Sequence, residues 1–143
     1  MNINEIKKWF ESAMPEPTRE QIAIQVGCHL EEVCEMLESI NLGGSEAMDS
    51  LDLESSEFKC QPSDYYLNKL DDVIKTELLD SLADQIVTAI GVAHMFGFDI
   101  ENALEEVNRS NFSKFEDGKP VFDSNGKITK GKNYTPPNLK PFV

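Results

Sequence analysis

The chain has 143 residues and a formal net charge of -13, a size that suits one domain with its own hydrophobic core. So negative a charge disfavours binding to nucleic acid, and no stretch reaches the roughly 18 consecutive apolar residues of a membrane helix. The first residues, MNINEIKKWF, lack the pattern of a signal peptide, so we expect a soluble cytoplasmic protein that binds neither nucleic acid nor a membrane.

The first half of the chain carries two clear helical patterns. Apolar residues at helical spacing predict a short helix over residues 3–13 and a long one from Arg19 to about Ile40. Thr18 and Gln21 have the spacing of a capping box before the long helix, and the glycines of NLGG (41–44) suit its end. Residues 45–62 are acidic and serine-rich, which predicts a loop or a weak helix.

The second half begins with the longest helical pattern, from about Tyr65 to Phe96, and a break near Asp71–Asp72 is left open. Gly97 ends this pattern, and a helix from Ile100 to about Asn111 follows. From Lys114 onward, glycines and prolines exclude a helix, and KPVF and KITK on either side of DSNG predict a small β-hairpin. We therefore expect an all-α fold, a four- to five-helix bundle in a single domain (1–143), with core helices over about 19–111.

The tail differs from this core in charge. Residues 1–109 contain 7 Lys and Arg against 23 Asp and Glu, whereas residues 110–143 contain 6 Lys against 3 acids. The sequence thus predicts an acidic body with a basic, irregular tail over residues 112–143.

One cluster of acids stands at the head of the segment 77–96. Glu77, Asp80 and Asp84 share one helix face, and the next twelve residues carry no formal charge. A helix that is apolar on nearly every side is expected to be buried, and buried carboxylates without partners cost several kcal/mol each. A divalent cation such as Mg²⁺, which prefers oxygen ligands, would neutralise them. The alternative is that these acids lie on solvated first turns, where acids also suit a helix N-terminus.

A second cluster lies in LEEVCEMLE (30–38), where Glu31, Glu35 and Glu38 fall roughly opposite the apolar stripe of the helix. Alone, such a pattern is more typical of a solvated face. Two helices that each carry acids one turn apart can, however, be packed so that the acids converge on metal ions.

The order of these motifs resembles a known group of enzymes. Residues 31–35 reproduce an EExxE motif, and Asp84 begins an apolar run that ends at Gly97 and is followed by Asn108. Over about residues 20–115 the chain resembles the all-α nucleoside triphosphate pyrophosphohydrolase superfamily, whose signature is EExxE and a later ExxD. That group includes MazG-like enzymes, phosphoribosyl-ATP pyrophosphohydrolases and dimeric dUTPases, and the tail is similar to that of small MazG-like proteins of phages and mobile elements.

Two departures from the family pattern stand out. Ser81 occupies the place of the ExxD glutamate, so Asp80 or Glu77 must supply that carboxylate, and we expect Asp80. The gap between the two motifs is also longer than is usual in the family, consistent with an insertion at 41–62.

The resemblance implies Mg²⁺-dependent hydrolysis of a nucleoside triphosphate to the monophosphate and pyrophosphate, in nucleotide-pool cleansing, with Mn²⁺ as a substitute ion. It implies Glu31, Glu32 and Glu35 as catalytic residues, with Glu31 a further ligand or the base that orients water. The implied metal ligands are Glu32, Glu35, Asp80, Asp84 and, less strongly, Glu77. Asn108, Asn111 and Lys114 would bind the substrate.

The family also implies a homodimer or a homotetramer. Two alternatives to a general nucleotide pyrophosphohydrolase remain. One is an enzyme specific for phosphoribosyl-ATP or dUTP. The other is a non-catalytic helical module for oligomerisation or nucleotide sensing, which Ser81 at the motif position favours.

Overall fold

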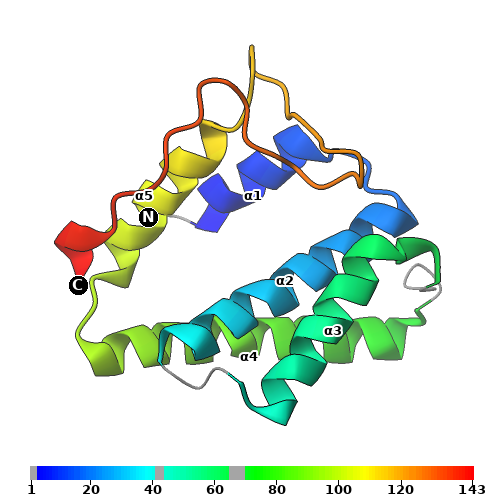
Figure 1. The fold of residues 1–143 in the computed structure, drawn as a ribbon, viewed down its shortest axis with the longest axis horizontal. Coiled ribbons are helices and arrows are strands. Elements are labelled where there is room, and N and C mark those ends of the chain that lie inside the picture. Colours follow the sequence, from blue (N-terminus) through cyan, green and yellow to red (C-terminus); the bar gives the residue numbers. More distant parts are fainter. Residues whose placement is uncertain (1–2, 41–43, 65–69) are drawn as a thin grey trace. The chain divides into compact units, whose positions relative to one another are not determined.

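The computed structural model describes residues 3–40, 44–64 and 70–143, and the predicted all-α class is confirmed. Five α-helices lie in these residues, with two short 3₁₀ turns, η1 and η3 (Figure 1). The helices are α1 (Ile3–Ala13), α2 (Arg19–Ser39), α3 (Glu46–Cys60), α4 (Asp72–Phe96) and α5 (Ile100–Phe112), and the turns are η1 (Pro62–Asp64) and η3 (Lys140–Phe142).

The chain divides into two compact units. Unit 1 comprises Met1–Pro15, Leu70–Val121 and Ile128–Val143, and unit 2 comprises Glu16–Lys69 and Phe122–Lys127. Unit 1 therefore contains α1, α4, α5 and most of the tail, whereas unit 2 contains α2, α3 and the turn at residues 122–127. Each unit is described by itself below.

Local capping signals set the starts of α2 and α3. The capping box of α2 is complete, because Thr18 Oγ1 accepts from Gln21 N and Thr18 N donates to Gln21 Oε1. Of the two alternatives for residues 45–62, the structure shows a helix over 46–60, which Ser45 caps by accepting from Met48 N. Buried Met48 explains this helix better than its sequence pattern does, since tertiary packing stabilises helices of weak amphipathicity.

The long helix α4 begins later than its pattern predicts. Asp71 is its N-cap and accepts from Ile74 N, so the break near Asp71–Asp72 is confirmed. The predicted start near Tyr65 lies outside the described residues. At its other end, Gly97 takes a φ of 78°, and its N–H and that of Phe98 donate to carbonyls of the last turn. The chain then bends by 118° into α5.

The tail forms turns rather than strands. Asp123 N donates to Lys127 O, and Gly126 has a φ of 81°, so a turn is present at DSNG. In the described part of the chain there is no named strand, and the predicted hairpin is not confirmed. The later tail instead runs back to α5, where Asp99 N donates to Phe142 O.

Within unit 2, α2 and α3 cross in close contact at Gly27 (Figure 1). Ser55 is fully buried at this crossing, and its hydroxyl donates to Gly27 O over 2.9 Å. A Cβ added at Gly27 would lie only 2.7 Å from both Ser55 O and Lys59 Cγ. The crossing therefore requires a residue without a side chain at position 27.

Unit 1 has an aromatic core where α1 packs against α5 and the residues after it. Trp9 is buried and stacks on Phe115 with ring centroids 5.7 Å apart, while Phe10 meets it edge-on. Phe112 of α5 joins the cluster through Phe115. These contacts hold the start of the tail against α1.

Within unit 1, the prediction that α4 is buried is wrong, because Ala93 is the only buried residue of this helix. Within unit 1, α5 is the helix that contacts α4. The large apolar side chains of α4 are 41–84% exposed: Val73, Ile74, Leu78, Leu79, Leu82, Ile86, Val87, Ile90, Val92, Met95 and Phe96. No single helix among the described residues is both long and apolar enough to cross a membrane, although α4 and α5 pass that test together as a bent pair.

Replacing Gly27 with alanine should lower the free energy of unfolding by about 1–3 kcal/mol, because the new methyl group overlaps α3. Gly91→Ala is the matched control, since no atom lies within 4 Å of its added Cβ. That variant should gain about 0.5–1 kcal/mol from reduced backbone entropy. Urea denaturation followed by circular dichroism measures both, and equal stability of the two variants would contradict the close crossing.

Candidate functional site

The EExxE motif lies on α2, and its first glutamate is held by two lysines. Glu31 Oε1 lies 2.9 Å from Lys59 Nζ of α3, and Glu31 Oε2 accepts from Lys127 Nζ at 2.8 Å. Burial raises the pKa of Glu31, but the hydrogen bonds from Lys127 and Lys59 outweigh it and leave that pKa below its usual value. The hydrogen bond between Lys127 and Glu31 also raises the pKa of Lys127. Glu31 is thus an ionised, partly buried carboxylate with both oxygens engaged.

The other glutamates of this segment have different surroundings. Glu32, Glu35 and Glu38 are exposed, whereas Glu31 is half-buried beside α3. The expectation that Glu31 shares a solvated face with Glu35 and Glu38 is therefore wrong. Glu35 makes no hydrogen bond or ion pair within the residues that the structure describes, so its carboxylate remains available to a ligand.

Among the acids of unit 2, Glu31 pairs with two lysines. Unit 2 contains 4 Lys and Arg against 13 Asp and Glu, and two of these four cations pair with this one carboxylate. The lysines come from different segments, and Lys127 is 96 residues away from Glu31 in sequence. Spacing along the chain therefore gave no signal for the pair.

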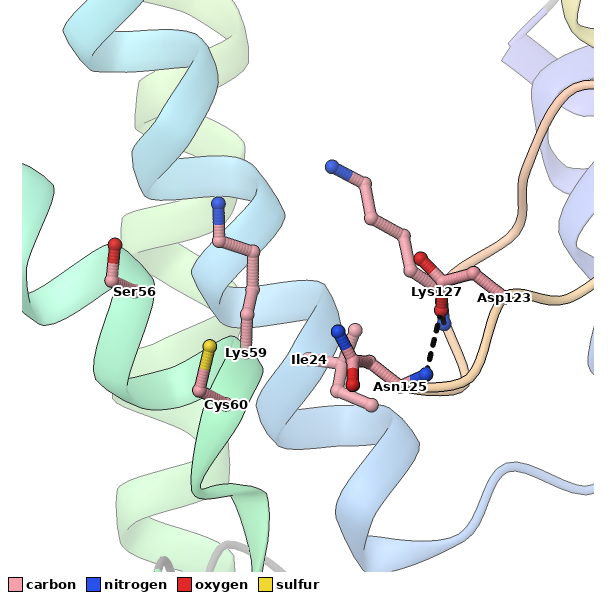
Figure 2. A pocket seen from close by; sticks show the side chains of 7 residues that line it. All are labelled: Ile24, Ser56, Lys59, Cys60, Asp123, Asn125 and Lys127. Carbon is pink, nitrogen blue, oxygen red and sulfur yellow. Dashed lines mark hydrogen bonds between the residues drawn. The ribbon is translucent and has the colours of Figure 1, made fainter.

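A pocket of about 240 Å³ lies beside this ion pair in unit 2 (Figure 2). Figure 2 shows α3 on one side and the turn on the other, with Ile24 between them. The side chains that line it are Ile24 of α2, Ser56, Lys59 and Cys60 of α3, and Asp123, Asn125 and Lys127 of the turn. Asp123 holds the turn in shape by accepting from the backbone N–H groups of residues 125 and 127.

The acids of α4 are exposed, so the alternative of solvated first turns describes Glu77, Asp80 and Asp84 in this structure. Because these carboxylates are exposed, they do not require a cation to offset the cost of burial. Their carboxylates make no hydrogen bond or ion pair with the described parts of the chain, and no three His, Cys, Asp or Glu side chains there gather as a metal site. These acids belong to unit 1 and the EExxE motif belongs to unit 2.

The predicted substrate-binding residues lie at the end of α5 and just after it. Asn108 and Asn111 are half-buried, and the carbonyl of Asn111 accepts from Lys114 N. Lys114 Nζ lies 5.9 Å from the centroid of the Trp9 ring, within the range of a cation–π contact. All three residues are in unit 1 with the α4 acids.

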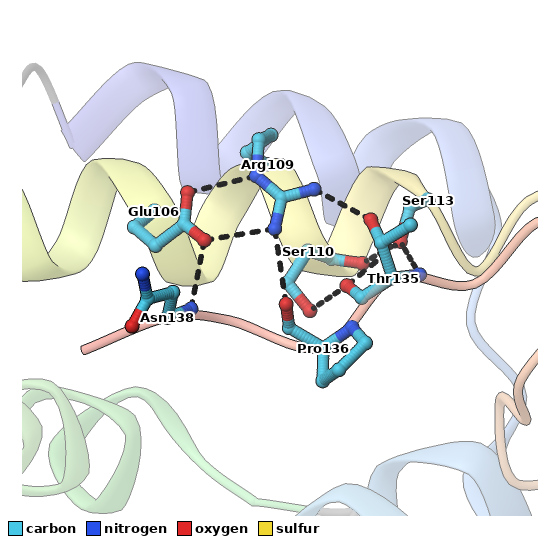
Figure 3. A network of polar contacts seen from close by, with 7 residues as sticks. All are labelled: Glu106, Arg109, Ser110, Ser113, Thr135, Pro136 and Asn138. Carbon is cyan, nitrogen blue, oxygen red and sulfur yellow. Dashed lines mark hydrogen bonds and ion pairs between the residues drawn. The ribbon is translucent and has the colours of Figure 1, made fainter. Parts of the chain in front are cut away.

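Sequence reasoning missed a polar network that fixes the tail to α5 (Figure 3). Arg109 donates to both oxygens of Glu106, to Thr135 Oγ1 and to the carbonyl of Pro136. Buried Ser110 donates to Thr135 O over 2.9 Å. The spacing of Glu106 and Arg109 predicts an ion pair on a helix. The contact of this pair with Thr135, 26 residues after Arg109, could not be predicted from spacing.

This network sets a pH dependence. The hydrogen bonds from Arg109, and then from the Asn138 backbone, lower the pKa of Glu106 from 4.5 to about 2. A lowered folded-state pKa stabilises the fold above the unfolded value of 4.5, and that contribution is lost as the pH falls through about 2.

Glu106→Gln should therefore lower the melting temperature at neutral pH and flatten its decline between pH 4.5 and 2. Thermal melts across this pH range measure the effect. Glu54→Gln, at an exposed glutamate of α3, is the control and should follow the parent protein. Parallel curves for the parent and Glu106→Gln would rule out this role.

Comparisons with protein families, with curated proteins and with solved structures found no match to this chain.

Proposed function

We propose that the protein is a Mg²⁺-dependent nucleotide pyrophosphohydrolase that converts a nucleoside triphosphate to the monophosphate and pyrophosphate. The observation that carries this proposal is the presence in one chain of an EExxE motif on α2 and of three acids on one face of α4, which are followed by residues 85–98 without formal charge. Neither cluster alone would support it, since acidic helix faces are common on protein surfaces.

The donor chemistry fits the proposed ion. Glu35, Glu77, Asp80 and Asp84 present carboxylates that no described residue engages, and Mg²⁺ takes such hard oxygen ligands. Glu32 is exposed beside Glu35 on α2. Bound Mg²⁺ would neutralise phosphate charge and acidify a water molecule for attack.

The spacing on α4 also accounts for Ser81. Glu77 and Asp80 have the spacing of the ExxD motif. They lie one turn before Ser81 and Asp84, the two residues that align with the motif. Glu77 and Asp80 can thus act as the motif pair, with Asp84 as a further ligand one turn on. This arrangement gives Glu77 a larger part than its sequence position alone indicates.

The remaining residues position the substrate. Water adds to the α-phosphorus, the bond from that phosphorus to the bridging oxygen breaks, and pyrophosphate leaves. Lys114, with Asn108 and Asn111 close by in sequence, would hold the phosphates of the substrate or the departing pyrophosphate. Glu31, bound by two lysines, is better placed to orient its neighbours on α2 than to take the proton of the water.

The exposed α4 favours an assembly of more than one copy. At 100° per residue, Ile74, Leu78 and Leu82 line one side of α4, while Leu79, Ile86 and Ile90 line the adjacent side. One neighbouring helix covers a stripe of about 100°, so the whole apolar surface needs more than one neighbour. Residues 85–98 carry no formal charge, so two copies of this acidic chain could meet there without like-charge repulsion.

Glu35→Gln and Asp84→Asn should each reduce Mg²⁺-dependent pyrophosphate release by about 100-fold or more, because each removes a metal ligand. Glu38→Gln is the control, since Glu38 lies on the same helix and is exposed but falls outside the motif. The assay uses a panel of nucleoside triphosphates that includes dUTP, together with phosphoribosyl-ATP.

The panel also separates the alternatives. Turnover of one nucleotide alone would identify a specialist, and turnover of many would exclude one. Absence of pyrophosphate release together with no rise in melting temperature in millimolar Mg²⁺ would leave the non-catalytic module.

Ile90→Glu should reduce the molar mass in solution to that of one chain, because it places a charge within the apolar surface at residues 85–98 of α4. Thr76→Glu puts the same charge on exposed α4 outside this segment and should leave the assembly intact. Light scattering after size exclusion measures the mass. A parent protein that is already monomeric at high concentration would refute the assembly.

A further inference from the structure

The pocket of unit 2 shares one side of α2 with the EExxE motif. Ile24, Cys28, Glu31 and Glu35 follow at steps of four, three and four residues, which keeps them on one side of a helix. At 1.5 Å per residue, Ile24 lies about 10 Å before Glu31 along the helix axis, and Glu35 lies about 6 Å beyond it. Three features therefore follow one another along this side of α2: the apolar side chain of Ile24, the lysine pair at Glu31, and the free carboxylate of Glu35.

That order matches the parts of a nucleotide bound to a metal. The base needs an apolar surface for its face, the phosphates need cations, and the metal needs carboxylates. Ile24 supplies the first, and Lys59 and Lys127 stand next to it. Each lysine binds one oxygen of Glu31 and also lines the pocket, so its ammonium group lies where it can attract phosphate.

The walls of the pocket carry groups that recognise the edge of a heterocycle. The amide of Asn125 has both donors and an acceptor, and the hydroxyl of Ser56 can donate or accept. Figure 2 shows Asn125 on the turn and Ser56 on α3, on opposite sides of Ile24. The volume of about 240 Å³ is below the roughly 300–1,000 Å³ of pockets for whole small molecules, so only part of a nucleotide fits.

We propose that this pocket binds the base of the nucleotide, with Asn125 and Ser56 as specificity-determining residues and Lys59 and Lys127 beside the phosphates. The assignment rests on the proposed function for the identity of the ligand. It goes further by placing base recognition within one chain, on α2, α3 and the turn at 122–127. The turn at 122–127 then has a role in ligand binding, because it carries both Asn125 and Lys127.

Cys60 offers a readout that does not depend on catalysis. Its thiol lines the pocket and is exposed, whereas Cys34 is buried and Cys28 is half-buried. Alkylation of the full-length protein by iodoacetamide, without Mg²⁺ and resolved by peptide mass spectrometry, gives the rate at Cys60. The added ligands are AMP, GMP, CMP, UMP and, separately, inorganic pyrophosphate.

One or more of the monophosphates should slow the alkylation of Cys60 about tenfold when present at about ten times its Kd, because occupied pockets are protected. Asn125→Ala should weaken that Kd about tenfold through lost hydrogen bonds to the base. The backbone bond from Asn125 to Asp123 survives this substitution, so the turn keeps its shape. Asn133→Ala, at an exposed tail asparagine in unit 1, is the matched control and should bind as the parent does.

Three results would overturn the base pocket. The first is protection by inorganic pyrophosphate equal to that by any nucleotide, which would show anion binding by the lysines alone. The second is equal Kd values for the Asn125 and Asn133 variants. The third is no protection at millimolar nucleotide while Mg²⁺-dependent pyrophosphate release persists, which leaves the enzyme intact and puts base recognition elsewhere. Protection without any pyrophosphate release would instead support the pocket and refute the catalytic proposal.

Discussion

Glu31 joins three segments of unit 2 through two ion pairs. It extends from α2, receives Lys59 from α3 and receives Lys127 from the turn at 122–127. A partly buried carboxylate is costly unless its oxygens are satisfied, and here each oxygen has one ammonium partner. The same arrangement places two cations on the side of α2 that carries Glu35. In a unit with 13 acids, the motif, the pocket and the turn all depend on this pairing.

Local signals predicted the elements that local forces determine. The capping box at Thr18, the end of α4 at Gly97 and the start of α5 after Asp99 are all as expected, because each depends on residues within one turn. The sequence of α3 does not decide between a loop and a helix, because the stability of this helix comes from burial of Met48 and Ser55 against other parts of unit 2. Such packing is decided by the partner helix and leaves little periodicity in the sequence.

The candidate site was predictable in composition and not in arrangement. The acids of α2 and α4 follow from spacing, yet nothing in the spacing showed that Glu31 differs from Glu35 in burial and in partners. The proposed base pocket joins Ile24 to Asn125, 101 residues apart, through a turn whose sequence signalled only a hairpin. Long-range contacts of this kind depend on the whole fold, and no local pattern records them.

The apolar surface of α4 shows why hydropathy alone cannot distinguish a buried helix from an interface. A buried helix covers its apolar surface with contacts inside the chain, and an interface helix covers it with contacts to another chain. The sequence pattern of the two is the same. The distribution of charge is more informative. Glu77, Asp80 and Asp84 lie on one face of α4, and formal charge is absent from residues 85–98. The proposed cation site and the proposed contact with another chain thus use different surfaces of one helix, an arrangement that would keep the acids solvated.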